Sequence, residues 1–305
     1  MQELWTSADI PRPEFLLEPI LYKGLPTIIF GEKAVCKSTL ALAVYACLML
    51  PWVENPLKWI APSHTVKTLL ADYEVGYDIA QWNIKELARG MELPPLPLYY
   101  RRCALPLADD IEQIHRHMAG IKAEVLIVDS LGPAVGGDLK DPSIALRFTA
   151  ALRQLNCSTL IIGQTSKEKE SKTKSVYGSI FFEYYARNIF ELRKVQEESE
   201  DSFDIALFNT YHNLGKRFKP QGFQMSFNGE GTHIISRPVT APEFIERMGV
   251  QQRILVLLKH GPLPNKEIKE QLSISFPSAS MALKRLAEKK MIMKVENNWG
   301  LISKM

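Results

Sequence analysis

The sequence predicts an α/β protein built on a mostly parallel sheet, with a second, smaller domain at the C-terminal end. Three observations support this prediction. Short apolar runs alternate with longer helical stretches between residues 27 and 192, which is typical of strands joined by right-handed crossovers. The length of 305 residues exceeds what one ordinary core needs. The segment Ser236–Pro242 resembles a linker, so we expect domains over residues 1–240 and 241–305.

The elements of the larger domain follow in order after an N-terminal segment, residues 1–25. The expected strands are Thr27–Phe30, Thr68–Ala71, Leu98–Tyr100, Val125–Val128 and Thr159–Ile162. The expected helices are Ser38–Leu50, Ala80–Met91, Asp109–Ile121 and Pro142–Leu155. Two later strands are expected at Phe203–Phe208 and Gln224–Phe227, with turns at Asn228-Gly229 and Glu230-Gly231. Such alternation places most strands parallel to one another.

The C-terminal domain is expected to contain three helices and a hairpin. The helices are Phe244–Lys259, a second that Asn265 caps and that runs through Leu272, and Pro277–Lys290. The hairpin strands are Met291–Val295 and Trp299–Ile302. This order resembles a winged helix-turn-helix domain, whose third helix enters the major groove of DNA. Such a domain is also used for protein contacts or ring assembly, and that alternative stays open.

The composition excludes several classes of protein. Hydrophobic residues make up 46% of the chain and charged residues 23%, so it is neither disordered nor fibrous. The four cysteines form no C-x-x-C pair, which suggests neither a zinc site nor a disulfide scaffold. Early acids and prolines, Glu3, Asp9 and Pro11, do not fit a signal peptide. The longest apolar run, Leu40–Val53, is too short for a membrane span. We therefore expect a cytoplasmic protein without membrane contact.

The net charge of +3 is unevenly divided along the chain. The segment from Glu243 onward holds eleven Lys and Arg against six acids, so it carries +5 and the remainder −2. A basic module on a nearly neutral body indicates contact with a polyanion such as DNA. A merely solvated basic surface is the alternative.

A phosphate-binding loop is the strongest local pattern. Residues Gly31–Thr39 follow the first strand and precede the first long helix, so backbone N–H groups and a helix N-terminus converge on one point. The loop resembles the Walker A pattern G-x-x-x-x-G-K-[ST], in which Lys37 reaches the β/γ-phosphates and Ser38 ligates Mg²⁺. The residues expected to bind ATP are Gly31, Glu32, Lys33, Ala34, Val35, Cys36, Lys37, Ser38 and Thr39. An ordinary strand–helix turn is the alternative.

Cys36 departs from this pattern because it occupies the position of the second glycine. Glycine lets the backbone turn tightly there without a Cβ beside the phosphates. ATP affinity and turnover are therefore both expected to suffer. The thiol also lies at a helix N-terminus beside Lys37, which suggests a lowered pKa and sensitivity to oxidation, although a tolerated substitution explains Cys36 as well.

A second pattern, an acidic residue at the end of an apolar strand, supports the phosphate-binding loop. The apolar run Val125–Val128 ends in Asp129, as in the Walker B pattern, where the carboxylate holds Mg²⁺ through water. Asp129 follows Lys37 by 92 residues with strands and helices between. The metal site expected from the sequence therefore comprises Ser38 and Asp129.

With these motifs the chain resembles the RecA-like ATPases, and within them the RepA-type hexameric helicases of plasmids, phages and mobile elements. The resemblance spans roughly residues 10–235 and depends most on two segments, 10–25 and 177–187. It implies an ATP- and Mg²⁺-dependent ring, a homohexamer, that contacts single-stranded DNA in its channel.

The resemblance also assigns residue roles. Glu74 ends a strand where these ATPases place the glutamate that activates the attacking water, with Asp72 as the competing acid. Gln164 senses the γ-phosphate, and Arg187 is the arginine finger that enters a neighbouring subunit's site, with Arg193 and Lys194 as alternatives. The catalytic residues expected are Glu74, Lys37, Asp129, Gln164 and Arg187.

Two regions are expected to contact DNA. In RecA-like rings, loops at the functional edge of the sheet, here Gly132–Pro142 and Thr165–Tyr177, bind single strands, and the second is rich in lysine. The third C-terminal helix would contact duplex DNA. The residues concerned are Lys167, Lys169, Lys172, Lys174, Ser278, Ser280, Lys284, Arg285 and Lys289.

The function expected from the sequence is ATP-driven DNA translocation or unwinding in replication, repair or a mobile element. Two alternatives remain: a nucleotide-gated DNA-binding regulator, and an ATP-binding subunit that hydrolyses little because of Cys36.

Overall fold

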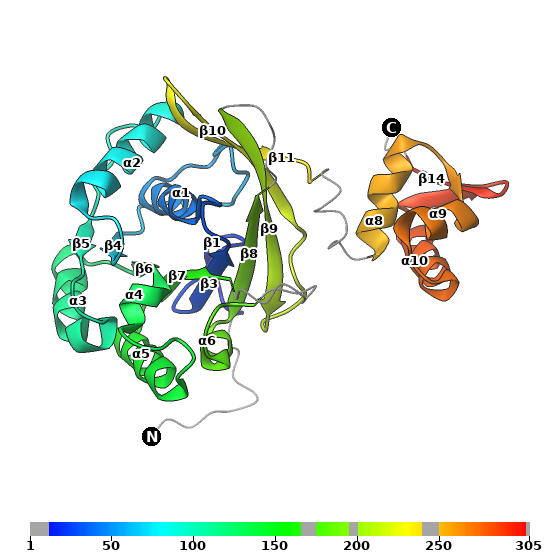
Figure 1. The fold of residues 1–305 in the computed structure, drawn as a ribbon. Coiled ribbons are helices and arrows are strands. Elements are labelled where there is room, and N and C mark those ends of the chain that lie inside the picture. Colours follow the sequence, from blue (N-terminus) through cyan, green and yellow to red (C-terminus); the bar gives the residue numbers. More distant parts are fainter. Residues whose placement is uncertain (1–11, 166–174, 195–200, 240–249, 303–305) are drawn as a thin grey trace. The chain divides into compact units, whose positions relative to one another are not determined.

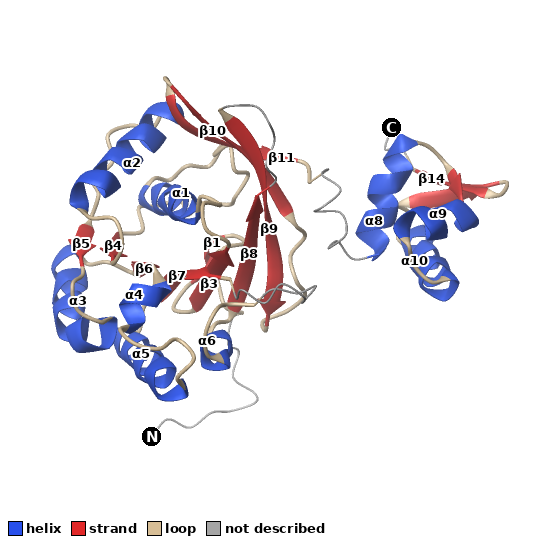
Figure 2. Ribbon diagram, viewed as in Figure 1, coloured by secondary structure: helices blue, strands red, loops and turns tan. Residues whose placement is uncertain are grey.

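The computed structural model describes residues 12–165, 175–194, 201–239 and 250–302. The chain divides into two compact units, Met1–Arg237 and Pro238–Met305. The first unit is a three-layer α/β structure in which helices cover both faces of a large sheet (Figures 1 and 2). The second is a small unit of helices and a three-stranded sheet.

A nine-stranded sheet forms the centre of the first unit, in the order β11-β10-β9-β8-β3-β7-β6-β4-β5. Its strands are β3 (Pro26–Gly31), β4 (Thr68–Asp72), β5 (Tyr100–Arg102), β6 (Val125–Asp129), β7 (Ser158–Gln164), β8 (Asn188–Lys194), β9 (Ser202–His212), β10 (Gln221–Asn228) and β11 (Gly231–Arg237). The six strands from β8 to β5 are parallel, and β9 to β11 continue the sheet antiparallel. The predicted α/β class with a mostly parallel sheet is confirmed.

Two hydrophobic cores lie on opposite faces of this sheet. One packs beneath α1 (Lys37–Met49) and α2 (Tyr77–Gly90). The other packs beneath α3 (Leu107–Ile121), α4 (Leu131–Val135), α5 (Pro142–Leu155) and α6 (Ile180–Tyr185). A short ribbon of β1 (Phe15–Leu17) and β2 (Leu21–Tyr22) adds to the first core. Every residue of α1 from Leu40 to Met49 is buried, which explains why this helix has no polar face.

Some of the secondary structure expected from the sequence differs from the observed elements. The strand expected at Leu98–Tyr100 is β5, which begins only at Tyr100, because an edge strand is half-exposed and lacks a clear apolar run. The expected loop Gly132–Pro142 contains part of α4, whose apolar side chains Leu131, Ala134 and Val135 are buried. The turn signals after β10 close a hairpin with β11, a strand that the sequence did not predict.

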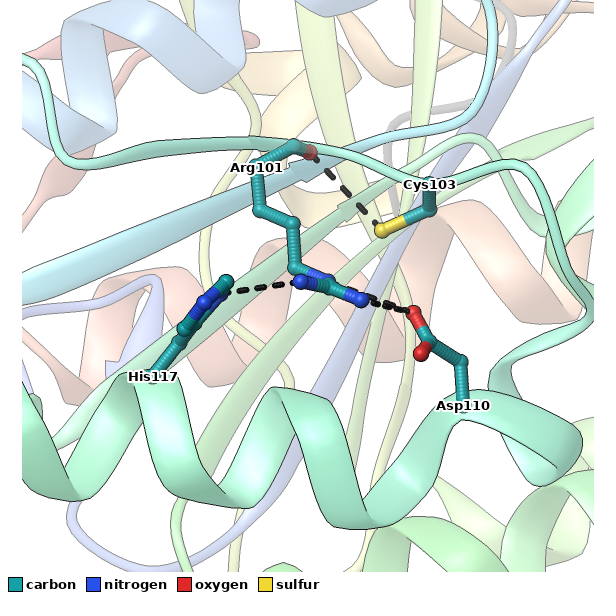
Figure 3. A network of polar contacts seen from close by, with 4 residues as sticks. All are labelled: Arg101, Cys103, Asp110 and His117. Atoms are coloured by element: carbon teal, nitrogen blue, oxygen red, sulfur yellow. Dashed lines mark hydrogen bonds and ion pairs between the residues drawn. The ribbon is translucent and has the colours of Figure 1, made fainter.

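A partly buried ion pair fixes the edge strand β5 to α3 (Figure 3). Arg101 donates from Nε and Nη2 to Asp110 Oδ2 at 3.2 and 2.6 Å, and its Nη1 lies 3.0 Å from His117 Nδ1. The Cys103 thiol donates to the Arg101 carbonyl at 3.7 Å. This network holds β5 in place beside the carboxyl end of β4, where acidic residues gather.

The C-terminal unit contains α8 (Val250–Leu257), a 3₁₀ turn (Leu258–His260), α9 (Asn265–Leu272) and α10 (Phe276–Glu288). Its sheet has the order β12-β14-β13, formed by β12 (Leu263–Pro264), β13 (Ile292–Val295) and β14 (Asn298–Leu301). Strand β12 was not foreseen. Asn265 is not the predicted cap of α9: Pro264 precedes the helix, and the Asn265 amide donates to Ser280 Oγ at 3.1 Å. Ser275 caps α10, since its hydroxyl accepts from the Ser278 amide.

Candidate active site

The predicted phosphate loop joins β3 to α1 at the carboxyl edge of the sheet. Strand β3 is buried throughout, and α1 begins at Lys37. Gly31 ends the strand against β8, where an added Cβ would lie 2.5 Å from the Leu192 carbonyl oxygen. Only glycine therefore fits at this position, and the loop starts from a fixed point in the sheet.

Two residues of the loop, Ala34 and Cys36, have left-handed backbone conformations with φ of 59° and 60°. Cys36 directly precedes α1 with ψ of 36°. This conformation costs a residue with a Cβ about 1–2 kcal/mol, and glycine adopts it freely. The structure thus gives a physical reason for glycine in the motif: the backbone at Cys36 has a left-handed conformation that strains a residue with a Cβ.

The Cys36 thiol does not have the lowered pKa that the sequence suggested. Burial raises its pKa, and this exceeds the opposing effects of Lys194, Lys37 and a hydrogen bond with Thr39. A neutral thiol reacts slowly with oxidants, since the thiolate is the nucleophile. The hypothesis of an oxidation-sensitive Cys36 is therefore wrong for this conformation of the loop.

The Lys37 ammonium group lies inside the loop that it follows. Its Nζ donates to the carbonyl oxygens of Gly31 at 3.1 Å and Glu32 at 2.5 Å. Burial lowers the pKa of Lys37, whereas the nearby carboxylates of Asp129 and Glu74 raise it. These three charged groups therefore lie near one another at the carboxyl edge of the sheet.

Asp129 ends β6 and is only 9% exposed. Ser38 donates a hydrogen bond to this carboxylate, but Asp129 Oδ1 has no partner among the described residues. Burial, together with the nearby carboxylates of Glu74 and Asp72, raises the pKa of Asp129 to about 6 against the lowering effects of Ser38 and Lys37. A buried carboxylate oxygen without a partner, beside a serine hydroxyl, is a donor set that suits Mg²⁺. The pair Ser38 and Asp129 thus fits the expected metal.

Asp72 and Glu74 compete for the role of water-activating acid, and their surroundings differ. Asp72 accepts hydrogen bonds from four donors, the backbone amides of Glu74, Val75 and Gly76 and the Tyr100 hydroxyl, at 2.7–3.0 Å. Burial raises its pKa, but these bonds bring the pKa below its ordinary value. Both Asp72 oxygens are thus committed to the turn that starts α2.

Glu74 is the carboxylate at this edge that remains exposed. Its Oε2 accepts a hydrogen bond from Ser130 Oγ at 2.8 Å. Ser130 follows Asp129, so it links the two acidic strand ends. The sequence analysis did not single out Ser130, although its place directly after the acidic strand end is a signal for it. Of the two acids, Glu74 has the geometry to hold a water molecule.

Gln164 is the last residue of β7 and lies opposite Gly31 in the parallel register of β3 and β7. Its side chain is exposed. It is therefore close to the phosphate loop in the same chain.

Arg187 lies at the other edge of the sheet. It precedes β8, whose Leu192 pairs with Gly31, so five residues or about 16 Å of strand separate Arg187 from the loop. Its Nη1 donates to the carbonyl oxygens of Tyr184 and Tyr185 at 3.1 and 3.3 Å. The structure does not bring Arg187 to the site of its own chain.

The two alternatives to Arg187, Arg193 and Lys194, are at the carboxyl end of β8. Arg193 forms an ion pair with Glu191 at 2.8 Å. Lys194 lies 3.6 Å from the centre of the Phe203 ring and near enough to Cys36 to lower the pKa of its thiol. Lys194 thus belongs to the phosphate loop of its own chain, which argues against its acting as a finger in a neighbouring one.

The residues expected to bind DNA are only partly described. Lys167, Lys169, Lys172 and Lys174 lie outside the described residues. On α10, Ser278, Lys284 and Arg285 are exposed, and so is Lys289 directly after the helix, whose Nζ donates to Gln251. Ser280 is half-buried against α9 through its bond with Asn265.

A buried strand, a glycine-started loop, a lysine at a helix start and carboxylates on the neighbouring strand ends define a P-loop nucleotide-binding protein. The chain belongs to the family described as "AAA domain", whose sequence profile matches residues 2–170. It is therefore a P-loop ATPase. Its fold is of the α/β class with a mostly parallel central sheet, as the sequence predicted.

A solved structure of a KaiC-like protein from the hyperthermophilic archaeon Pyrococcus horikoshii is similar to the chain. The two share 15% sequence identity with a TM-score of 0.49, and the match covers 74% of this chain and 96% of that one. No curated protein matches the chain. Across the described ranges, no helix has the length and apolar character to cross a membrane, and no three His, Cys, Asp or Glu side chains form a metal cluster.

Proposed function

We propose that this P-loop ATPase is a ring-forming, ATP-dependent DNA translocase or helicase of the RepA type, acting in the cytoplasm. The observation that carries the proposal is the joint position of Lys37, Asp129 and Glu74 at one edge of the sheet, with Arg187 at the other. One chain thus holds a phosphate site and an arginine that lies at the opposite end of β8 from it. Such a site is completed by a second copy.

The chemistry follows from the side chains of the site. Lys37 and the amides of the loop bind the phosphates of ATP, and the bonds that Lys37 now makes to carbonyl oxygens give way to bonds with phosphate oxygens, in which both partners are charged. Glu74 orients the attacking water, with Ser130 fixing its carboxylate. Gln164 lies beside the loop to sense the γ-phosphate. Mg²⁺, held by Ser38 and Asp129, would neutralise charge that develops on the phosphates.

The DNA-binding part of the proposal rests on the C-terminal unit and on the lysines of residues 167–174. The order helix, strand, two helices and hairpin resembles a winged helix-turn-helix domain. The face of α10 presents Ser278, Lys284 and Arg285 to solvent, which suits contact with a phosphate backbone or with duplex DNA. The ring would hold single-stranded DNA in its channel.

Two other functions remain candidates because of specific observations. The strained backbone at Cys36 favours an ATP-binding subunit with little hydrolysis. The exposed polar face of α10 suits a nucleotide-gated regulator that binds an operator. Strand displacement that depends on ATP distinguishes the translocase from both.

The arginine finger gives the sharpest test. Arg187→Ala is expected to leave ATP binding nearly unchanged and to lower turnover by roughly 10³–10⁵, because a finger acts on the transition state of a neighbour. Mixing Arg187→Ala chains with Lys37→Ala chains restores part of the activity, since one type of junction joins an intact Lys37 to an intact Arg187. The control replaces Arg153, which lies over the Tyr185 ring beside α6, with alanine. No recovery in mixtures that still assemble would mean that Arg187 does not act between subunits.

A further inference from the structure

Strand β8 carries a lysine to the phosphate loop of its own chain. Strands β8 and β3 are neighbours in the sheet (Figure 1), and Leu192 of β8 pairs with Gly31, the residue at which the loop begins. Lys194, the last residue of β8, follows two positions later. The strand therefore places Lys194 about 7 Å beyond the pair, toward the carboxyl edge of the sheet where the loop lies.

The alternation of side chains along β8 directs Lys194 to the face of the sheet that α1 covers. Leu192 packs in the hydrophobic core beneath α1, and a residue two positions further along a strand points to the same face. Cys36 of the loop and Phe203 of β9 pack against this core as well. Arg193, by the same rule, points to the opposite face. Of these two neighbouring cations, Lys194 is therefore the one on the side of the phosphate loop.

The ring of Phe203 holds Lys194 near Cys36. The Lys194 ammonium lies 3.6 Å from the centre of this ring, a cation–π contact that limits where the side chain can point. Phe203 is itself stacked on Phe227, with ring centres 5.9 Å apart. Among the groups that lower the pKa of the Cys36 thiol, Lys194 has a larger effect than Lys37, which agrees with its position beside the loop.

We propose that Lys194 binds the α- and β-phosphates of the nucleotide held by its own chain, beside Cys36. In a loop of this type the backbone amides hold the α/β-phosphates, and the loop lysine reaches the β/γ-phosphates. Lys37 donates to carbonyl oxygens at the start of the loop. Lys194 lies at its other end, where Cys36 leads into α1. The two cations therefore serve different parts of the phosphate chain. This inference rests on the phosphate site of the proposed function and not on its ring.

Carboxylates are the competing partners for this cation. Glu197, Glu198 and Glu200 follow Lys194 in the chain but lie outside the described residues, and Asp201 is exposed just before β9. Within the ranges that the structure describes, Lys194 forms no ion pair. A phosphate chain brings several negative charges to one point, and the loop amides and the start of α1 attract it to this place. We therefore expect phosphate to displace a carboxylate from Lys194.

Nucleotide titration tests the contact. Lys194→Gln removes the charge and keeps most of the side chain, and it should weaken a non-hydrolysable ATP analogue and ADP equally, each by about tenfold. The kcat at saturating ATP should change by no more than about twofold, because the contact is present both before and in the transition state. Lys194→Arg should keep most of the affinity. Lys23→Gln is the matched control, since Lys23 is exposed and precedes β3 at the opposite end of the sheet.

Two results of this titration overturn the proposal. An unchanged affinity of Lys194→Gln for both nucleotides would mean that the lysine binds something other than the phosphates. A loss confined to the ATP analogue would place the ammonium at the γ-phosphate. Thermal unfolding without nucleotide is measured for every variant, and we expect Lys194→Gln to unfold at the temperature of the parent, because its side chain is only half-buried.

Mixed proteins show whether Lys194 acts within its own chain. If it does, every site in a mixture of Lys194→Gln and Lys37→Ala chains carries one defect, so turnover at limiting ATP is the average of the two proteins alone. Turnover above that average would mean that Lys194 serves a neighbouring chain, which overturns the proposal. The mixture of Arg187→Ala with Lys37→Ala is measured in parallel. If that mixture does not recover but Lys194→Gln still weakens both nucleotides, the proposed ring fails and the Lys194 contact stands.

Discussion

Asp129 carries a charge that the folded chain stabilises poorly in the absence of metal. Its Oδ1 atom has no hydrogen-bond partner among the described residues, and burial raises the pKa of the carboxyl from 3.8 to about 6. The substitution Asp129→Asn removes the charge and keeps the shape. We therefore expect the metal-free Asp129→Asn variant to be more stable than the parent, although it loses a magnesium ligand.

The size of the effect depends on pH. A shift of about two pKa units corresponds to about 3 kcal/mol. Near pH 4 the Asp129 carboxyl of the folded protein is protonated, so its burial lowers the free energy of unfolding only slightly. As pH rises from about 4 through about 6, the unfolded chain releases its proton first, so the parent loses stability until the cost is complete above pH 7. The variant's side-chain amide is buried without a partner, which costs about 1 kcal/mol and reduces this gain. The net gain at pH 7.5 is about 2 kcal/mol, or roughly 4–8 °C for a unit of this size.

The assay is thermal unfolding of both proteins at pH 4 to 8, with a chelator and without nucleotide. Asp110→Asn is the matched control, because Asp110 is equally buried but paired with Arg101 at 2.6 Å and should lose stability. A stability difference between Asp129→Asn and the parent that stays constant across this pH range would refute the reasoning. So would a variant that is less stable than the parent at pH 7.5.

Three further outcomes are expected. Lys37→Ala abolishes ATP binding or turnover, measured by nucleotide titration and phosphate release, because the loop loses the cation that reaches the phosphates; normal turnover would remove the assignment of the site. Cys36→Gly raises ATP turnover or affinity by relieving a left-handed backbone, and a slower variant would show that the loop has adapted to the cysteine. Gly90→Ala destabilises the first unit by about 2 kcal/mol in denaturant unfolding, because the added Cβ would lie 2.3 Å from the Thr232 carbonyl oxygen, whereas Gly120→Ala, with open space around it, should be neutral or slightly stabilising.

The position of the phosphate loop was determined by the sequence alone. A loop that ends in Lys37-Ser38, between a buried strand and an apolar helix, has few other structures open to it, because local geometry aims its amides at one point. For Asp129, the run of four apolar residues before it predicted a buried strand with the carboxylate at its end, and β6 has this form. These features depend on neighbours in the chain.

Choices between similar residues required the tertiary structure. Asp72 and Glu74 are two positions apart and chemically alike, and only the hydrogen bonds from Tyr100 and three backbone amides commit Asp72 to the turn. The pKa of Cys36 was likewise misjudged, because a helix N-terminus and Lys37 can be seen in the sequence but burial cannot.

The distance of each basic residue from the phosphate loop also could not be predicted from the sequence. Arg187 is close in sequence to Arg193 and Lys194, but the whole length of β8 lies between them. Lys194 is therefore at the phosphate loop, and Arg187 is at the opposite edge of the sheet. Which strand pairs with which, and in what register, is set by contacts between segments far apart in sequence. The sequence therefore indicated where phosphate can bind, and the packing of the sheet decided which acid is left exposed there and how far Arg187 lies from the phosphate loop of its own chain.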